Sequence, residues 1–296
     1  MARSDFVKPQ ITSFHDPATS TFTYVVYDRA NGNAAVIDPV LDFDPASART
    51  STASADRVLD FVQAQQLRVD WILETHAHAD HLTAAAYLRR KTGAKVGIGR
   101  GITTVQARFQ ALFGIGAEMV ADGSQFDRLF DDGDTVQVGG LEVHVLATPG
   151  HTDDSLTYLI GDAAFVGDTV FAPETGTARA DFPGGDARKL YHSIRRLFGL
   201  PADTRLFLCH DYPPSSRSPS AETSLDAQRR TNIHVGAQSS EDSFVAMRTA
   251  RDATLPSPRL MLPALQVNIR AGELPPPDAN GIRYLRLPLN QLGSPG

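Results

Sequence analysis

The sequence predicts an α/β fold in which two mixed β-sheets face each other and carry helices on their outer sides. Segments typical of strands alternate along the chain with segments typical of helices. The order strand, strand, helix, strand, helix, strand is followed by four strands, a helix and a strand, which indicates two similar halves. A Rossmann sheet is also compatible with this alternation. The chain contains no G-x-G-x-x-G and no Walker loop, however, so no motif supports nucleotide binding.

The first half is predicted to begin with a hairpin, because two strand-like segments flank a Gly/Asn turn. Its elements are strands over 21–28 and 34–39, a helix over 54–66, a strand over 69–76, a helix over 82–93 and a strand over 94–99. The first helix is predicted from its apolar stripe, which includes Val58 and Val62. The second helix is predicted to end at Gly93, a residue type common at helix C-termini.

The second half is richer in strands and is followed by a change of composition. Its elements are strands over 135–138 and 141–147, two strands within 155–171, a helix over 187–198 and a strand that starts at Thr204. After Pro213 we expect a polar loop over 215–222, a helix over 242–251 and a strand-like piece over 264–270. We therefore divide the chain into a domain over 1–213 and a C-terminal extension over 214–296. The extension has too little apolar content for a core of its own, so we expect it to pack on the same domain.

Composition excludes several classes of protein. Hydrophobic residues make up 42% and charged residues 21% of the chain, which is ordinary for a globular protein and excludes a disordered chain, a collagen and a coiled coil. The net charge of −6 argues against a nucleic-acid partner. The one cysteine, Cys209, excludes an internal disulfide and a cysteine-built zinc finger. No apolar leader or membrane-spanning run occurs, so we expect no membrane partner and a cytoplasmic location.

A dense set of histidines and aspartates follows the predicted strand ends. The residues with metal-ligand chemistry are His76, His78, Asp80, His81, His151, Asp168 and His210. The segment THAHADH alone holds three imidazoles and a carboxylate within six positions. Burying these groups together without a metal ion would be costly, and the apolar flanks WILE and LTAAAYL argue against a solvated tract. The isolated histidines are expected to be structural or at the surface: His15, His144, His192 and His234.

Four motifs carry a resemblance to a known family. THAHADH, PGHT, GDT and CHDY, in this order and spacing, resemble the metallo-β-lactamase superfamily over residues 11–212. The resemblance implies an αββα sandwich with a metal site at one edge, between the two sheets. It also implies two metal positions, with Asp168 between them. His76, His78 and His151 would face the first position, and Asp80, His81 and His210 would face the second.

Within the superfamily, three segments resemble the persulfide dioxygenases, with glyoxalase II as the neighbouring family. The segments are ETHAHADHLTAAAYLRRKTGAKVGIG, GTARADFPGGDARKLYHSI and CHDY. This resemblance implies one Fe(II) per chain, held by His76, His151 and Asp168 as metal ligands and catalytic residues. The other potential ligands would be retained without filling a second site: His78, Asp80, His81 and His210. The implied reaction oxidises glutathione persulfide, or a related small persulfide, with O2 to sulfite and thiol, as in sulfide detoxification.

The substrate-binding residues also come from the resemblance. It implies that Arg179 and Tyr212 contact glutathione, although TARADF departs from the usual GRTDF at Ala178 and Ala180. A surface salt bridge is the alternative role for Arg179. Cys209 is interpreted either as a small apolar residue at a strand end or as a redox-active thiol.

Two alternatives to the dioxygenase stay open. The same ligands could hold Zn(II), and two zinc ions would indicate a thioester hydrolase of the glyoxalase II type. The other alternative is a non-enzymatic binding protein, against which the full ligand set argues. We expect a homodimer.

Overall fold

The protein, described here from a computed structural model over residues 8–291, contains two six-stranded β-sheets that pack face to face. The strands of the first sheet are, in spatial order, β1 (Gln10–Asp16), β2 (Thr21–Tyr27), β3 (Asn33–Ile37), β6 (Arg68–Leu73), β8 (Lys95–Gly99) and β9 (Arg128–Phe130). Those of the second are β10 (Thr135–Val138), β11 (Leu141–Ala147), β12 (Leu156–Ile160), β13 (Ala163–Phe165), β14 (Arg205–Phe207) and β15 (Glu222–Ser224). The predicted αββα sandwich is confirmed.

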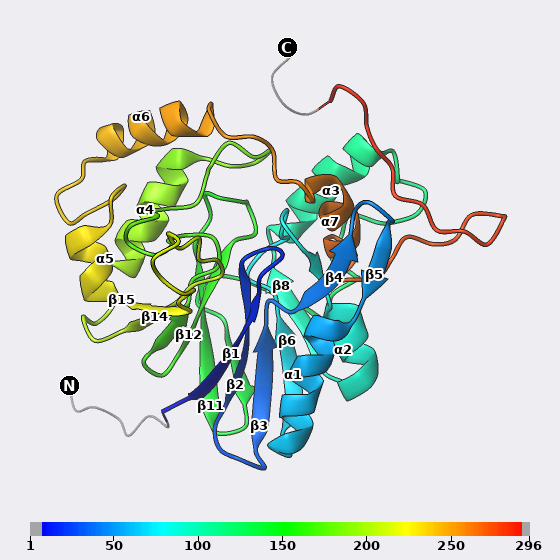
Figure 1. Ribbon diagram of the computed structural model, residues 1–296, viewed down its shortest axis with the longest axis horizontal. Coiled ribbons are helices and arrows are strands. Elements are labelled where there is room, and N and C mark those ends of the chain that lie inside the picture. The colour runs from blue at the N-terminus through cyan, green and yellow to red at the C-terminus, as the bar shows by residue number, and fades with distance from the viewer. Residues whose placement is uncertain (1–7, 292–296) are drawn as a thin grey trace.

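Helices cover the outer face of each sheet (Figure 1). The first sheet carries α1 (Ala53–Ala64), α2 (Ala85–Thr92), α3 (Ile102–Phe113) and α7 (Met261–Asn268). The second carries α4 (Ala187–Leu197), α5 (Leu225–Thr231) and α6 (Glu241–Asp252). Three buried apolar layers result, one between the sheets and one under each set of helices. Because α6 and α7 lie in these outer layers, the end of the chain shares its apolar contacts with the sandwich.

Parallel pairing positions the ends of the central strands. Strand β3 pairs in parallel with β6, β6 with β8, and β13 with β14. The carboxyl ends of parallel strands meet at one edge of a sheet. A small third sheet formed by β5 (Arg49–Ser51), β4 (Val40–Asp44) and β7 (Leu82–Thr83) adds to the first half of the chain. The loops after β6, β13 and β14 carry the predicted metal ligands.

One predicted element is wrong, and one predicted helix starts later than expected. Residues 264–270 were expected to be strand-like, but Ala264 to Asn268 belong to helix α7. The helix is buried almost all round, so it shows no amphipathic period, and β-branched Val267 and Ile269 resemble a strand. Pro263 lies in the first turn of α7, where no intrahelical N–H bond is needed. The helix predicted over 82–93 starts only at Ala85, because Leu82 and Thr83 pair with β4 as strand β7.

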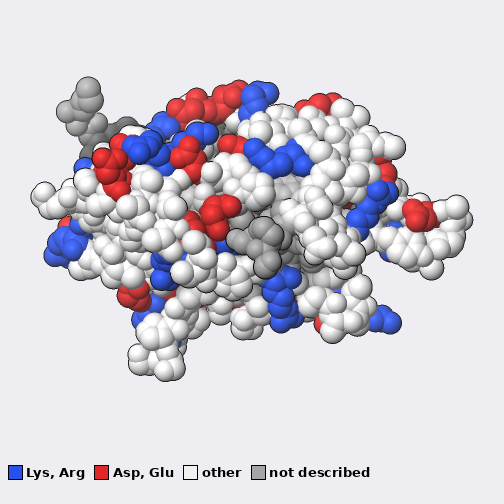
Figure 2. Space-filling model, turned by 90° about the horizontal axis from the view of Figure 1, so that it is seen from above, with Lys and Arg blue, Asp and Glu red and all other residues white. Residues whose placement is uncertain are grey.

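Basic and acidic side chains of the described residues are interspersed on the face seen in Figure 2. No helix within residues 8–291 is long and apolar enough to span a bilayer. The division of the chain at residue 213 stays a prediction.

Candidate metal centre

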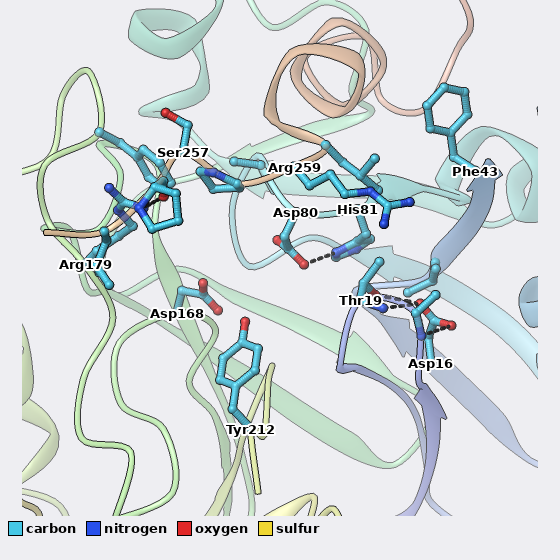
Figure 3. A pocket seen from close by; sticks show the side chains of 18 of the residues that line it. Asp16, Thr19, Phe43, Asp80, His81, Asp168, Arg179, Tyr212, Ser257 and Arg259 are labelled. Atoms are coloured by element: carbon cyan, nitrogen blue, oxygen red, sulfur yellow. Dashed lines mark hydrogen bonds and ion pairs between the residues drawn. The ribbon is translucent and has the colours of Figure 1, made fainter. Parts of the chain in front are cut away.

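The predicted ligands come from loops at one edge of the sandwich. His76 to His81 follow β6, His151 follows β11, Asp168 follows β13 and His210 follows β14. All four loops meet, and the side chains of Asp80, His81 and Asp168 lie around one cavity (Figure 3). The sandwich therefore brings together residues up to 134 positions apart, as the motif pattern predicted.

The first ligand group consists of His76, His151 and Asp168. One ligand atom from each lies within 4.8 Å of the other two, and all three side chains are buried. The Nε2 of His151 is 3.6 Å from Oδ2 of Asp168. Two buried atoms, Nε2 of His76 and Oδ1 of Asp168, have no hydrogen-bond partner among the described residues. Buried polar atoms of this kind normally have a partner, so the group fits a metal ion.

Hydrogen bonds fix the ring protons of both histidines. Thr75 donates its hydroxyl to Oδ2 of Asp38 at 2.8 Å, so its oxygen is left to accept from Nδ1 of His76 at 3.1 Å. The Nδ1 of His151 donates to the carbonyl oxygen of Arg179 at 2.8 Å. Both rings therefore present an unprotonated Nε2 to the site, as metal binding requires. Burial, with the charges of the neighbouring imidazoles, also holds the pKa of His76 well below its usual value.

The second ligand group consists of His78, Asp80 and His81, whose ligand atoms also lie within 4.8 Å of one another. Oδ2 of Asp80 is 3.1 Å from Nδ1 of His81 and 3.3 Å from Nε2 of His210. Burial opposes ionisation of both groups of the Asp80–His210 pair, but their mutual attraction is stronger. It holds the pKa of Asp80 well below, and that of His210 well above, the usual value. The second group thus forms ion pairs of its own, while Nδ1 of His78 and Nε2 of His81 have no hydrogen-bond partner among the described residues.

Two buried carboxylates support the ligand loop, which is the loop of residues 74–81 between β6 and β7. The sequence did not single out either of them as a site residue. Asp38 accepts from the backbone N–H of Thr75 at 2.7 Å and lies 3.1 Å from Nε2 of His78. It has a φ of +50°, a conformation that Asp tolerates better than most residues. Asp154 accepts from the N–H of Ala77 at 2.8 Å. An aspartate directly after an apolar strand, as in AAVID, was the available signal for Asp38.

Cys209 is buried beside the ligands, with its Sγ within 4.8 Å of ligand atoms of His78 and His210, and it does not line the cavity. Its Sγ is 3.8 Å from Oδ2 of Asp38, and the residue is 1% exposed. Burial raises the pKa of this thiol, so it is protonated at neutral pH. A buried, protonated thiol is poorly suited to redox chemistry, whereas its neighbours Asp38, His78 and His210 are polar, so both interpretations of Cys209 stay predictions.

The cavity in front of the ligands has a volume of about 1020 Å³. Tyr212 lines it with 49% of its surface exposed, and its ring stacks on His210 at a centroid distance of 5.8 Å. Its hydroxyl points toward the space between Asp168 and Asp80 (Figure 3). Tyr212 therefore lies where the sequence placed it, beside the ligands and open to a bound molecule.

Arg179 also lines the cavity, but its guanidinium already has partners. Nε and Nη2 donate to the two carboxylate oxygens of Asp181 at 2.6 and 2.7 Å, and Nη1 donates to the carbonyl oxygen of Pro256 at 2.7 Å.

The same cavity is lined by Arg251 and Arg259 of the C-terminal extension. Both are exposed, and neither side chain forms a hydrogen bond or contact ion pair within residues 8–291. No motif in the sequence pointed to these two residues.

Comparisons with known proteins agree with the geometry. The family described as the metallo-beta-lactamase superfamily matches residues 16–210. A "Probable metallo-hydrolase" of Burkholderia pseudomallei is 52% identical over 95% of this chain and 99% of its own. "Glyoxylase B2" of Dictyostelium discoideum is 44% identical over 96% and 98%, and human mitochondrial "Persulfide dioxygenase ETHE1" is 30% identical over 87% and 86%. The crystal structure of ETHE1 from Myxococcus xanthus aligns with a TM-score of 0.71 and 34% identity, covering 89% of this chain and 100% of that one.

Proposed function

The chain belongs to the metallo-β-lactamase superfamily, and on this basis we propose that it is an iron-dependent persulfide dioxygenase. The proposed reaction converts a persulfide, O2 and water to a thiol, sulfite and two protons. Its substrate is glutathione persulfide or a related small persulfide. The observation that carries the proposal is the group of His76, His151 and Asp168. Two imidazoles and a carboxylate are the ligand set of non-haem Fe(II) oxygenases.

The metal and the protein have separate tasks in this proposal. Bound Fe(II) would supply the redox chemistry that dioxygen requires, which zinc lacks. The chain fixes the Nε2 lone pairs of His76 and His151 through the acceptors on Thr75 and Arg179. Buried positions around the ligands exclude bulk water from one side of the site.

Charges at the cavity support an anionic substrate. Arg251 and Arg259 line the cavity and form no contact ion pair within residues 8–291, where Asp44 lies near enough to Arg259 to interact with it electrostatically. A glutathione moiety carries carboxylates that suit such groups through charge-assisted hydrogen bonds. Tyr212 adds an exposed ring and hydroxyl on the opposite side of the ligand loops. The ETHE1 relatives support the same substrate class.

A second candidate is a dinuclear zinc hydrolase of glutathione thioesters. The second ligand group favours it, because His78, Asp80 and His81 with His210 offer enough donors for another ion. The relative named glyoxylase B2 points in the same direction.

Metal analysis of protein purified without oxygen separates the two candidates. The dioxygenase predicts about one iron and little zinc per chain, and oxygen uptake with glutathione persulfide. Two tightly bound zinc ions, together with thioester hydrolysis and no oxygen uptake, would refute the dioxygenase. A cytoplasmic location and a homodimer stay predictions; light scattering of the purified protein tests the second.

A further inference from the structure

Asn268, on the last helix of the described chain, binds the ligand loop from behind. It belongs to α7 and is 3% exposed. Its Nδ2 donates to the carbonyl oxygens of His78 and His81, both at 2.8 Å, and its Oδ1 accepts from the N–H of Thr83 at 2.8 Å. We infer that Asn268 is a positioning residue, which holds the second half of the ligand loop in its metal-binding shape.

The partners determine the orientation of the amide. Only Oδ1 can accept from the N–H of Thr83, and only the NH2 group can serve two carbonyl oxygens. These partners therefore determine which end of the Asn268 amide is oxygen and which is nitrogen, because the flipped amide would not match them. The carbonyls of His78 and His81, three residues apart, converge on one nitrogen, which fixes the bend between them.

This contact complements the two carboxylates at the start of the loop. Asp38 holds the N–H of Thr75 and Asp154 that of Ala77. Neither carboxylate accepts from a backbone N–H of residues 78–83, and Asn268 binds this stretch at three points. The stretch carries the second ligand group, His78, Asp80 and His81. Without Asn268, two carbonyl oxygens and one N–H at the buried base of the loop would lose their partner.

The expected consequence is weaker metal binding. A loop that is not held in place must be ordered when the ion binds, and that cost is subtracted from the affinity. Removing partners that orient metal ligands typically lowers metal affinity about tenfold to a hundredfold. The inference rests on the proposed metal centre. The rings of His76 and His78 lie 4.1 Å apart between centroids, so a released stretch also disturbs the first ligand group. The expected loss therefore does not require an ion at the second group.

Gln266 on the same helix provides a matched control. It is 2% exposed and also forms three hydrogen bonds. Its Nε2 donates to the carbonyls of Leu262 and Arg286 at 2.9 and 3.0 Å, and its Oε1 accepts from the N–H of Arg286 at 2.8 Å. These partners belong to α7 itself and to the C-terminal segment, not to the ligand loop. Changing Gln266 therefore disturbs the helix without releasing His78 or His81.

The test compares Asn268→Asp with Gln266→Glu, using Co²⁺ as the probe. Competition with a chelator measures the affinity, the visible spectrum of bound Co²⁺ reports its ligand geometry, and thermal unfolding of the metal-free proteins reports stability. We expect both variants to lower the unfolding temperature. Only Asn268→Asp should weaken Co²⁺ binding, by about tenfold to a hundredfold, and change the spectrum. The added negative charge of Asp would by itself strengthen cation binding, so it cannot explain a loss.

Equal Co²⁺ affinities for Asn268→Asp and wild type, or equal losses in both variants, would overturn the inference. If wild type binds no Co²⁺, the proposed metal centre fails instead. A measurement without variants covers the case in which Asn268→Asp does not fold. Hydrogen exchange of the Thr83 amide in metal-free wild type should be as slow as that of the buried amides of α7. An amide that exchanges freely until Co²⁺ is added would refute the role of Asn268.

Discussion

Replacing Arg248 with methionine is expected to destabilise the protein strongly, because this arginine is the largest fully buried side chain of the described residues. It belongs to α6 and is 1% exposed. Nε and Nη2 donate to Oδ1 of Asp252 at 2.9 and 2.6 Å, and Nη1 donates to the carbonyl of Thr177 at 3.2 Å. Methionine fills similar space but leaves the Asp252 carboxylate buried without its cation.

The expected magnitude follows from the burial of this pair. Breaking a buried ion pair by removing one partner costs about 3–5 kcal/mol. Replacing both partners by apolar residues restores charge balance, but the N–H of Ala180 then loses its acceptor, Oδ2 of Asp252, at a cost of about 1–3 kcal/mol. The double variant Arg248→Met/Asp252→Leu should therefore be about 2 kcal/mol more stable than Arg248→Met alone. Chemical denaturation at neutral pH measures both free energies of unfolding.

His234 gives a second readout of the same change. Burial, followed by the charges of Arg248 and Arg251, lowers its pKa from 6.5 to about 4, and its Nδ1 accepts from the N–H of Thr177 at 3.0 Å. As the pH decreases, the imidazole of His234 is therefore protonated in the unfolded chain before it is protonated in the folded chain. The contribution of neutral His234 to stability is full above about pH 6.5 and falls as the pH decreases toward 4. In Arg248→Met the pKa of His234 should rise, which shortens this pH window.

NMR titration of His234 and denaturation curves at two pH values check these expectations. An Arg248→Met variant within about 1 kcal/mol of wild type, with an unchanged His234 pKa, would refute the buried-pair reasoning.

Other substitutions test the site directly. His76→Ala or Asp168→Ala should abolish iron binding and oxygen uptake, whereas His210→Ala should keep most of the iron; equal iron loss in all three, measured by elemental analysis, contradicts the division into two ligand groups. Arg259→Ala should raise KM for glutathione persulfide about tenfold to a hundredfold and change kcat less, because one charge-assisted hydrogen bond is worth roughly 1.5–3 kcal/mol. Arg179→Ala should raise KM less than Arg259→Ala, because the donors of Arg179 already bind Asp181 and Pro256. The opposite order, measured by oxygen uptake, would indicate that Arg179 binds the substrate carboxylate.

The local pattern predicted the strands, most helices and the metal-ligand types, whereas the choice of the sandwich over a Rossmann sheet came from the motif resemblance. Strands such as β2 and β6 are predictable because they are rich in β-branched and aromatic residues. The ligand histidines follow strand ends, in loops of the kind that often carry functional residues. The pattern failed for α7, because a helix surrounded by core has no polar face to reveal its period.

The supporting residues were harder to predict for a different reason. Asn268 is one amide in an apolar segment, and its importance comes from the loop it touches, not from its neighbours in sequence. Arg251 and Arg259 belong to the same class: only folding brings them to the cavity. The sequence did not decide whether Arg179 binds the substrate or forms a salt bridge. Its partner Asp181 is only two positions away, but spacing alone does not determine where a side chain points.

The contact between Asn268 and His78 spans 190 positions of the chain, and this distance affects the order of events during synthesis. The ribosome delivers the ligand loop long before Asn268. Such a long-range contact forms only after the intervening chain has folded enough to bring both ends together. A nascent chain that ends before α7 therefore carries every candidate ligand but lacks Asn268, which orders their loop. We expect metal capture to follow the synthesis and docking of α7 rather than to guide the folding of the sheets.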